Sequence, residues 1–445
     1  MSGQIAELPS SWAWRTVAEI GEVSLGRQRS PNNHAGPHMR SYVRAANITW
    51  NGWDLSDVKQ MNFDPRDFQR FRLRVGDVLL NEGSGSAKEV GKPAIWRGEI
   101  DDCCFQNTLI RVQPTRCSSE YLYFYFLWLA RSGGLAPETQ GVNIHHIGRA
   151  GIANCRLPVP SLAEQHRIVA RIEALFARTR RARADLERIA PLGAKVRRAT
   201  LARVFNADDD APIVVLGDLI SRIEAGKNIR CEERRPHAGE RGIVKISAVT
   251  WGRFDANAIK TAPASADLDP RSRIADGDFL LSRANTLELV GAPVIAEGVP
   301  AETYLSDKVL RLRFREPVDR WVMHFLRSPR GRSEIEQRSS GNQLSMRNIG
   351  QGALCEVPVP LPNAAVRDGA TATIDRSREA IEVAEHEAVR AVALLDRLEQ
   401  SILTRAFRGE LVPQEVGSSD ADQTPTNVHP SKTTQSQRRA NRVIA

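Results

Sequence analysis

The sequence predicts an α+β protein in which two homologous globular domains alternate with two long helices. Three observations lead to this fold class. The second half of the chain repeats the first at an offset of 200 to 202 residues. Each copy begins with short β-rich runs broken by Gly, Asn and Pro, and each ends in a long stretch with a heptad pattern. We therefore expect a pseudo-two-fold internal repeat of domain and helix.

The repeat rests on matches that keep both their order and their offset. They are VRAANITWNGWD from Val43 with VKISAVTWGRFD from Val244, GDVLLNEG from Gly76 with GDFLLSRA from Gly277, VGKPAI with VGAPVI, and LPVP at Leu157 with VPVP at Val357. Chance similarity does not keep its order in this way. The predicted boundaries are globular domains at 1–156 and 210–356, helices at 157–209 and 357–411, and a disordered Ser-, Thr-, Asn- and Gln-rich tail at 412–445.

Both helical stretches share one heptad frame. The expected a positions are Ile172, Thr179, Leu186, Gly193 and Thr200 in the first helix, and Ile374, Ile381, Ala388, Leu395 and Ile402 in the second. The expected d positions are Leu175, Ala182, Ile189 and Val196, with Ala384, Ala391 and Leu398. The shared frame favours an antiparallel coiled coil, with the domains at opposite ends of a rod, over two amphipathic helices on separate cores. Pro191 removes a backbone hydrogen bond and should kink the first helix.

Composition narrows the class of protein. The formal net charge is +9 and the pI about 9.5, which favours a polyanionic partner. None of the six cysteines forms a Cys-x-x-Cys pair, so a zinc site is not expected. The N-terminus has no signal-peptide pattern, and free thiols suit the reducing cytoplasm. The apolar run at 121–130 is too short to span a membrane and predicts a core helix.

A search for catalytic motifs finds none that is complete. Lys92 follows a glycine run that lacks the spacing and the Ser/Thr of a phosphate loop. Asp64-Pro65-Arg66 and Asp269-Pro270-Arg271 share two residues with an adenine methyltransferase motif, but turns explain them better. The pair His145-His146 has no evident carboxylate partner, so a DNA contact or a surface loop is favoured over a metal site. We expect no catalytic residue and no metal site.

Polar loops at matching positions in the two copies are better candidates, because Asn, Gln and Arg can bond base edges while a solvated turn is the alternative. The base-contact candidates are Ser84, Ser86, Gln140, Asn143, His145, Ser282, Arg283, Asn285, Thr286, Asn342, Gln343 and Arg347. The phosphate-contact candidates, which would position DNA without specifying its sequence, are Arg27, Arg29, Arg40, Arg44, Lys88, Lys227, Arg230 and Lys245.

The segment LPVPSLAEQHRIVARIEALFARTRRARADLERI resembles the helical region of the specificity subunits of type I restriction–modification systems. The opening LPSSWAWRTVAEIGEVSLGR and the two GDxLL-loop-VGxP segments resemble the target recognition domains of that family. The resemblance covers roughly residues 7 to 412. The second helix departs from the pattern, since NAAVRDGATATID replaces the usual AEQ-type entry.

The resemblance implies a non-catalytic subunit that reads a bipartite target in double-stranded DNA, one domain for each half-site. The paired helices would act as a ruler for the spacer and dock two methyltransferase subunits and two restriction subunits. Adenine N6 methylation and DNA cleavage would then be activities of those partner subunits. The cofactors S-adenosylmethionine, ATP and Mg would likewise bind to the partners and not to this chain. The alternatives are a specificity subunit of a methyltransferase-only system, a coiled-coil scaffold that binds protein, and a single-chain enzyme.

Overall fold

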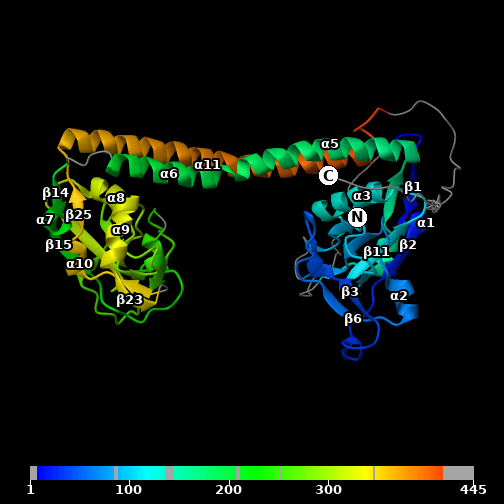
Figure 1. The fold of residues 1–445 in the computed structure, drawn as a ribbon, viewed down its shortest axis with the longest axis horizontal. Helices are drawn as coiled ribbons and strands as arrows, with labels where there is room; N and C mark the ends of the chain where they lie inside the picture. The colour runs from blue at the N-terminus through cyan, green and yellow to red at the C-terminus, as the bar shows by residue number, and fades with distance from the viewer. Residues whose placement is uncertain are drawn as a thin grey trace, which may run out of the picture. The chain divides into compact units, whose positions relative to one another are not determined.

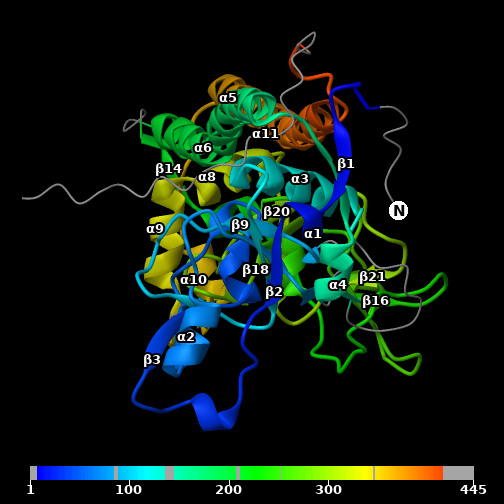
Figure 2. The ribbon, with the colours of Figure 1, turned by 90° about the vertical axis from the view of Figure 1, so that its right-hand side faces the viewer.

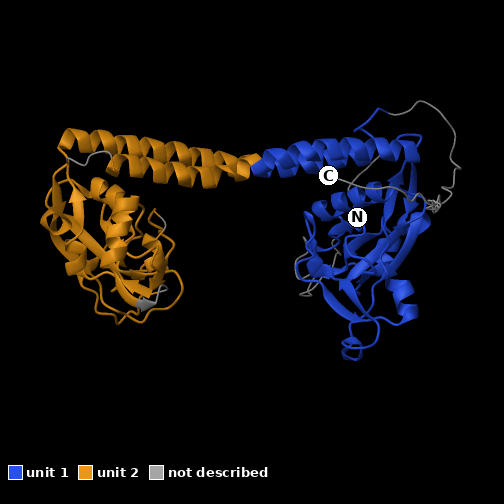
Figure 3. Ribbon diagram, viewed as in Figure 1, with its two compact units in different colours: residues 1–184, 392–445 blue, residues 185–391 orange. Residues whose placement is uncertain are grey.

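The computed structural model describes residues 8–84, 89–135, 145–206, 211–250, 252–343 and 346–413, without the side chains of Ser84, His145, Asn342 and Gln343. The predicted disordered tail lies outside the described residues from position 414 onward. Contacts divide the chain into unit 1, residues 1–184 with 392–445, and unit 2, residues 185–391 (Figure 3). Each unit holds one globular copy together with segments of the long helices (Figure 1).

The domain of unit 1 is built on a four-stranded sheet in the order β2-β11-β7-β9. These strands are β2 (Gly21–Leu25), β11 (Leu109–Pro114), β7 (Val78–Asn81) and β9 (Pro93–Ile95). A three-stranded sheet contains β10 (Cys104–Phe105), β3 (Met39–Val43) and β6 (Lys59–Asn62). The two-stranded pairs are β1 (Ala13–Thr16) with β13 (Arg156–Val159), β4 (Ile48–Thr49) with β5 (Gly52–Trp53), and β8 (Gly83–Ser84) with β12 (His145–His146). The α-helices are α1 (Val17–Ile20), α2 (Pro65–Phe71), α3 (Ser119–Ser132) and α4 (Gly148–Ala153).

The domain of unit 2 has the same plan. Its four-stranded sheet contains β15 (Ile220–Ala225), β22 (Val309–Phe314), β18 (Phe279–Ser282) and β20 (Pro293–Ile295), in that order. Its three-stranded sheets contain β17 (Ile259–Thr261), β16 (Gly242–Val244) and β21 (Thr303–Tyr304), and β19 (Ala284–Asn285), β24 (Met346–Asn348) and β23 (Ser340–Gln343). The remaining elements are β14 (Ile213–Val215) paired with β25 (Pro358–Pro360), and helices α7 (Leu216–Leu219), α8 (Asp319–Arg327), α9 (Pro329–Arg338) and α10 (Gln351–Cys355).

Side chains repeat along with the strands. Arg111 and Arg311 are both buried, at 4% and 3% exposure. Arg111 donates to the carbonyls of Arg70 and Arg72, and Arg311 donates to the carbonyls of the equivalent Arg271 and Arg273. Each buried guanidinium thus ties a β-strand to the end of a helical segment, α2 in unit 1 and a 3₁₀ turn at 270–272 in unit 2. The predicted duplication is confirmed at the level of single hydrogen bonds.

The core of unit 1 forms where α3 lies between the four-stranded sheet and the long helices (Figures 1 and 2). The apolar run at 121–130 falls within α3, where nearly every residue is buried, so the predicted core helix is confirmed. Tyr121 and Tyr125 stack edge-on against Phe407 of the second long helix. In unit 2, Phe205 of the first long stretch packs edge-on against Phe325 and at a tilt against Trp321.

The first long stretch is divided into α5 (Leu162–Glu187) and α6 (Ile189–Asn206), while the second is the single helix α11 (Ala364–Phe407). The division lies at Arg188, three residues before Pro191. Pro191 has no N–H to donate to the carbonyl of Glu187, and its ring crowds that carbonyl. The predicted interruption of the first helix is therefore present.

The helix seam corrects the predicted heptad frame. The expected a row is buried or half-buried along both helices, as at Ile172, Gly193 and Ile402. The expected d row is wrong at three positions, because Val196, Ala384 and Leu398 are exposed, whereas Leu175, Ala182, Ile189 and Ala391 are half-buried. The second seam row lies one residue later, at Phe176, Arg183 and Arg197 in the first stretch and Arg378, Glu385, Val392, Glu399 and Ala406 in α11. Charged side chains in this row hid it from a search for apolar periodicity.

Polar contacts join the long helices inside each unit, and in unit 1 they show the direction of pairing. In unit 1, Arg183 lies 2.7 Å from Asp396, and the Thr179 hydroxyl donates to Glu399 over 2.6 Å. Residue numbers therefore fall on one helix as they rise on the other, so α5 and α11 are antiparallel there. In unit 2, Arg197 pairs with Glu385 at 2.8 Å.

The two helix entries attach to their domains by different chemistry. Gln165 of the AEQ segment is fully buried, accepts from the Ser118 N–H and donates to the Pro160 carbonyl. Its counterpart in the second copy, 202 residues later, is Arg367, which lies 3.7 Å from Glu316. The second helix, whose entry lacks the AEQ sequence, is thus attached to its domain by an ion pair where the first helix is attached by the hydrogen bonds of a neutral amide.

Candidate nucleic-acid interface

The two polar loops of each copy, about 60 residues apart in sequence, meet in a small antiparallel sheet. In unit 1, β8 pairs with β12, with Gly83 opposite His146. In unit 2, β19 pairs with β24, with Asn285 opposite Arg347. A backbone bond closes each arrangement in the same place, from Ile147 N–H to the Glu82 carbonyl and from Ile349 N–H to the Arg283 carbonyl, both at 3.0 Å. Each domain therefore presents one polar strand pair formed by two loops that are far apart in sequence, which we call its composite hairpin.

Arg283 offers the clearest free donor on the hairpin of unit 2. Its backbone is fixed on both sides, since its N–H donates to the Lys308 carbonyl over 2.8 Å. Its side chain is half-buried and forms no hydrogen bond or ion pair with any described residue. Asn285 accepts from the Thr286 N–H through Oδ1, which leaves its amide hydrogens available. Both side chains keep donors that a base edge can use.

Two other base-contact candidates serve the hairpin itself. Ser282 is fully buried, donates to the Leu289 carbonyl over 2.6 Å and accepts from the Ala292 N–H. A side chain enclosed in this way presents no atom to a base, so this geometry gives Ser282 a structural role. Arg347 of β24 donates to the carbonyls of Ser339 and Gly341, at the start of β23. Its guanidinium thereby joins β24 to the beginning of β23.

On the hairpin of unit 1, Ser86, Gln140 and Asn143 lie outside the described residues, as do the side chains of Ser84 and His145. The described part corrects one expectation. His146 has a carboxylate partner, because its Nδ1 lies 2.8 Å from Oε2 of Glu82. The sequence could not show this contact, since it depends on the β8–β12 pairing. Glu82, which is not among the expected base contacts, is an acceptor group on this hairpin.

Glu82 and Arg283 occupy the same place in the two copies. Each follows the central strand of its sheet, and each carbonyl accepts the closing bond of the hairpin. An ionised carboxylate only accepts hydrogen bonds, whereas a guanidinium only donates them. In the major groove a carboxylate suits the cytosine amino group, and a guanidinium suits guanine O6 and N7. The two hairpins thus share a backbone and offer opposite hydrogen-bonding chemistry.

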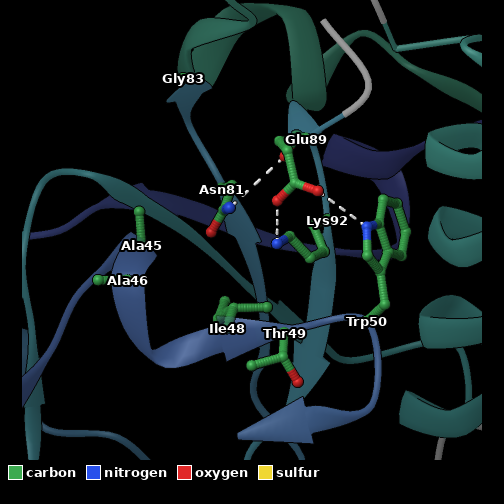
Figure 4. Close-up of a pocket in the computed structure, with 9 residues that line it drawn as sticks. All are labelled: Ala45, Ala46, Ile48, Thr49, Trp50, Asn81, Gly83, Glu89 and Lys92. Atoms are coloured by element: carbon green, nitrogen blue, oxygen red, sulfur yellow. Dashed lines mark hydrogen bonds and ion pairs between the residues drawn. The ribbon is translucent and has the colours of Figure 1, made fainter. Parts of the chain in front are cut away.

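An open pocket lies beside the hairpin of unit 1 (Figure 4). The Glu89 carboxylate accepts from Trp50 Nε1 over 2.9 Å and pairs with Lys92, whose ammonium lies 5.6 Å from the centre of the indole ring. Asn81 also lines the pocket, and its amide donates to the Glu89 carbonyl. At the positions of Asn81, Glu89 and Lys92 the second copy has Ser282, Leu289 and Ala292. Charge beside the hairpin is therefore a feature of the first copy.

Most of the described phosphate-contact candidates are paired with acids. Arg27 lies 2.7 Å from Asp67 and Arg44 2.6 Å from Asp57. The equivalent Lys227 and Lys245 lie 2.6 Å from Asp267 and Glu233. Arg40 lies over the ring of Phe68 and donates to the Met39 carbonyl. Arg29 and Arg230 are exposed, and Lys88 lies outside the described residues. The Lys227–Asp267 pair, with side chains 60% and 91% exposed, contributes little to stability, whereas Arg27 and Asp67 are only 14% and 27% exposed.

The motifs considered for catalysis have local structural roles. Lys92 is 7% exposed and neutralised by Glu89, so it does not face solvent as a phosphate ligand would. Asp64 caps α2 and Asp269 caps a 3₁₀ turn, where the sequence predicted turns. Within the described residues no group of three His, Cys, Asp or Glu side chains could hold a metal ion, and no helix is long and apolar enough to cross a membrane.

The six cysteines are all free. Burial raises the pKa of Cys103 and Cys104 to about 12, so both thiols stay protonated at neutral pH. A protonated, buried thiol is a poor nucleophile. Neither Cys103 nor Cys104 is therefore a candidate nucleophile.

Known proteins with similar sequences are DNA specificity subunits. Residues 9–189 match the family described as type I restriction modification DNA specificity domain. The chain is 24% identical over 431 residues to the specificity subunit of the type I restriction enzyme EcoKI of Escherichia coli K12, covering 92% of this chain and 91% of that protein. It is 23% identical over 426 residues to the StySPI specificity subunit of Salmonella potsdam, with the same shares covered.

Solved structures share the fold. The HsdS subunit from Thermoanaerobacter tengcongensis aligns with a TM-score of 0.56 at 21% identity, over 92% of this chain and all of that one. A chain from a structural study of complex assembly and conformational transition in a type I restriction–modification system aligns with a TM-score of 0.63 at 20% identity, over 91% of this chain and 99% of that one.

Proposed function

From the membership of this chain in the family of type I restriction–modification specificity subunits, we propose that it reads a bipartite DNA target for partner enzymes. Each composite hairpin reads one half-site, and the paired helices set the spacer between the half-sites. One observation carries the proposal: two domains of the same backbone design present different polar groups, Glu82 and Arg283, at the same position of the hairpin. A shared backbone with exchanged side chains is what two readers of different half-sites require.

In this proposal the chemistry belongs to partner subunits. Two methyltransferase subunits bind S-adenosylmethionine and methylate adenine at N6, and two restriction subunits use ATP and Mg to translocate and cut DNA. This chain binds double-stranded DNA and docks those partners in the prokaryotic cytoplasm. Its own residues contribute position and sequence choice, since an arginine or a carboxylate on a fixed hairpin selects a base pair by hydrogen-bond complementarity.

The test is methylome sequencing of the host with and without this chain. We expect a methylated motif made of two short specified sequences separated by an unspecified gap, present only with the chain. Methylation without cleavage of unmodified DNA would indicate a methyltransferase-only system. A methylome that does not change when the chain is removed would refute DNA reading and favour a protein-binding scaffold.

A further inference from the structure

Glu399 is a buried carboxylate in the seam between α5 and α11. It is 4% exposed, although the equivalent seam positions elsewhere on α11 are apolar or partly open. Its Oε2 accepts from Arg131 at 2.7 Å and its Oε1 from Thr179 at 2.6 Å. Arg131 belongs to α3 of the globular domain and Thr179 to α5. One side chain of α11 therefore joins three elements of unit 1.

The neighbours of Glu399 continue this contact along one face of α11. The Gln400 amide donates to the Trp128 carbonyl over 3.4 Å, and Trp128 Nε1 donates to the Thr404 hydroxyl over 3.0 Å. Both Trp128 and Arg131 lie in the last turn and a half of α3. The domain is thus attached to α11 at one definite height, by groups that bond in only one register.

Other registers of the helix pair lose these bonds. A shift of α11 by one heptad, about 10 Å at 1.5 Å per residue, would bring Val392 or Ala406 to the place of Glu399. Arg131 would then lose its carboxylate, and Glu399 would enter an apolar layer. A buried charge without a partner is strongly disfavoured, and a single polar residue in a helix seam specifies register for this reason.

The equivalent layer of unit 2 is less enclosed. There the pair is Arg197 with Glu385, and their side chains are 37% and 27% exposed, compared with 6% for Glu399. An exposed ion pair tolerates displacement, because water replaces the lost partner. Of these two ion pairs, the one at Glu399 therefore restricts the register of the helix pair more strongly.

We propose that Glu399 is a positioning residue that fixes the height at which the first recognition domain is held on the helix pair, and so determines the spacer length that the protein accepts. The inference rests on the proposed function, in which the helices set the spacer. Glu399 touches no base in this proposal. It acts through Arg131 and Thr179, by making one placement of the domain favourable and its neighbours unfavourable.

The decisive variant is the double substitution Arg131→Met with Glu399→Leu. Replacing a buried ion pair by apolar side chains of similar size is often neutral for stability, whereas removing one partner alone leaves a buried charge. The double variant should therefore fold while the bonds that select the register are gone. Glu399→Gln is the conservative variant, since an amide of the same shape can still accept from Arg131 or Thr179 through its oxygen.

Methylome sequencing of hosts that carry the full chain supplies the readout. We expect the double variant to keep both half-site sequences and to raise methylation at gaps about three base pairs shorter or longer, because a shift of one heptad is about 10 Å and a base pair rises about 3.4 Å. The rise should be about tenfold, the effect of losing one charged hydrogen bond. Glu399→Gln should restore most of the wild-type selectivity. The matched control is Glu387→Leu, an exposed glutamate on the same helix whose partner Arg390 is also on that helix.

Two results would overturn the inference. The first is a folded, active double variant whose gap length is as strict as that of the wild type, which would make Glu399 a purely structural residue. The second is a changed half-site sequence, which would place Glu399 in base reading. Failure of the proposed function is a separate result, because the wild-type chain would then direct no bipartite methylation at all.

Discussion

Removing the Arg283 side chain tests the assignment of the second hairpin most directly. The backbone of Arg283 is held by Lys308 and Ile349, and its guanidinium has no described partner, so Arg283→Ala should leave the fold intact. A paired contact from arginine to guanine contributes about 1–3 kcal/mol, which corresponds to roughly 5- to 150-fold in affinity. We expect a loss of this size for one specified base pair of one half-site, and none for the other half-site.

The assay is methylation by the assembled complex on duplexes in which each position of each half-site is varied in turn. Arg347→Ala is the matched control, because that guanidinium bonds the Ser339 and Gly341 carbonyls and its loss should weaken the pairing of β24 with β23. An equal loss on every sequence after Arg283→Ala would mark Arg283 as a phosphate contact. No loss on any sequence would remove it from the interface.

Three further predictions concern the framework. Arg311→Met removes one of the two guanidinium partners of the buried Asp278, together with the hydrogen bonds to the Arg271 and Arg273 carbonyls, and should cost unit 2 about 3–5 kcal/mol in thermal unfolding. Arg313→Met, at a half-exposed side chain, should cost less than about 1 kcal/mol, and similar costs would contradict the buried brace. Burial lowers the pKa of His324 from its usual 6.5, more than the nearby Asp375 raises it. As the pH falls, the unfolded chain therefore binds a proton at His324 before the folded chain does, so the free energy of unfolding should fall as the pH drops below 6.5. His324→Phe, which introduces the residue type of the equivalent Phe124, should make the free energy of unfolding depend less on pH in unfolding titrations. An unchanged dependence would assign the effect to other groups. Four residues inserted at Arg188, where the helix is already interrupted, should lengthen the helical stretch by about 6 Å. The gap between the two half-sites of the methylated motif should then grow by one or two base pairs. An unchanged gap would refute the proposal that the helices set the spacer length.

The sequence was sufficient for the architecture, because duplication leaves a signal in residue order that does not depend on local propensity. The heptad stretches located the helices, and Pro191 located their interruption. The seam frame was wrong for a physical reason. Glu385 and Glu399 lie in the seam through hydrogen bonds and ion pairs, and apolar periodicity scores such residues as exposed.

The candidate site was predictable as loops and less so as side chains. The repeat identified both polar segments in each copy, but not that they pair with each other, since strand pairing joins residues far apart in sequence. Composition also could not show that Ser282 faces inward or that Arg27 and Arg44 are paired with acids. These outcomes depend on neighbours that only the fold supplies.

The different helix entries give the two domains different responses to ionic strength. Gln165 holds the first domain through neutral hydrogen bonds in a buried place, which dissolved ions hardly affect. Arg367 and Glu316 hold the second through charge, at a distance of 3.7 Å and with Glu316 45% exposed. At 1 M salt the screening length is about 3 Å, so this attachment weakens while the first persists. A concentrated electrolyte would thus weaken the attachment of the second domain to its helix before that of the first, so two copies of one ancestral design would respond unequally to salt.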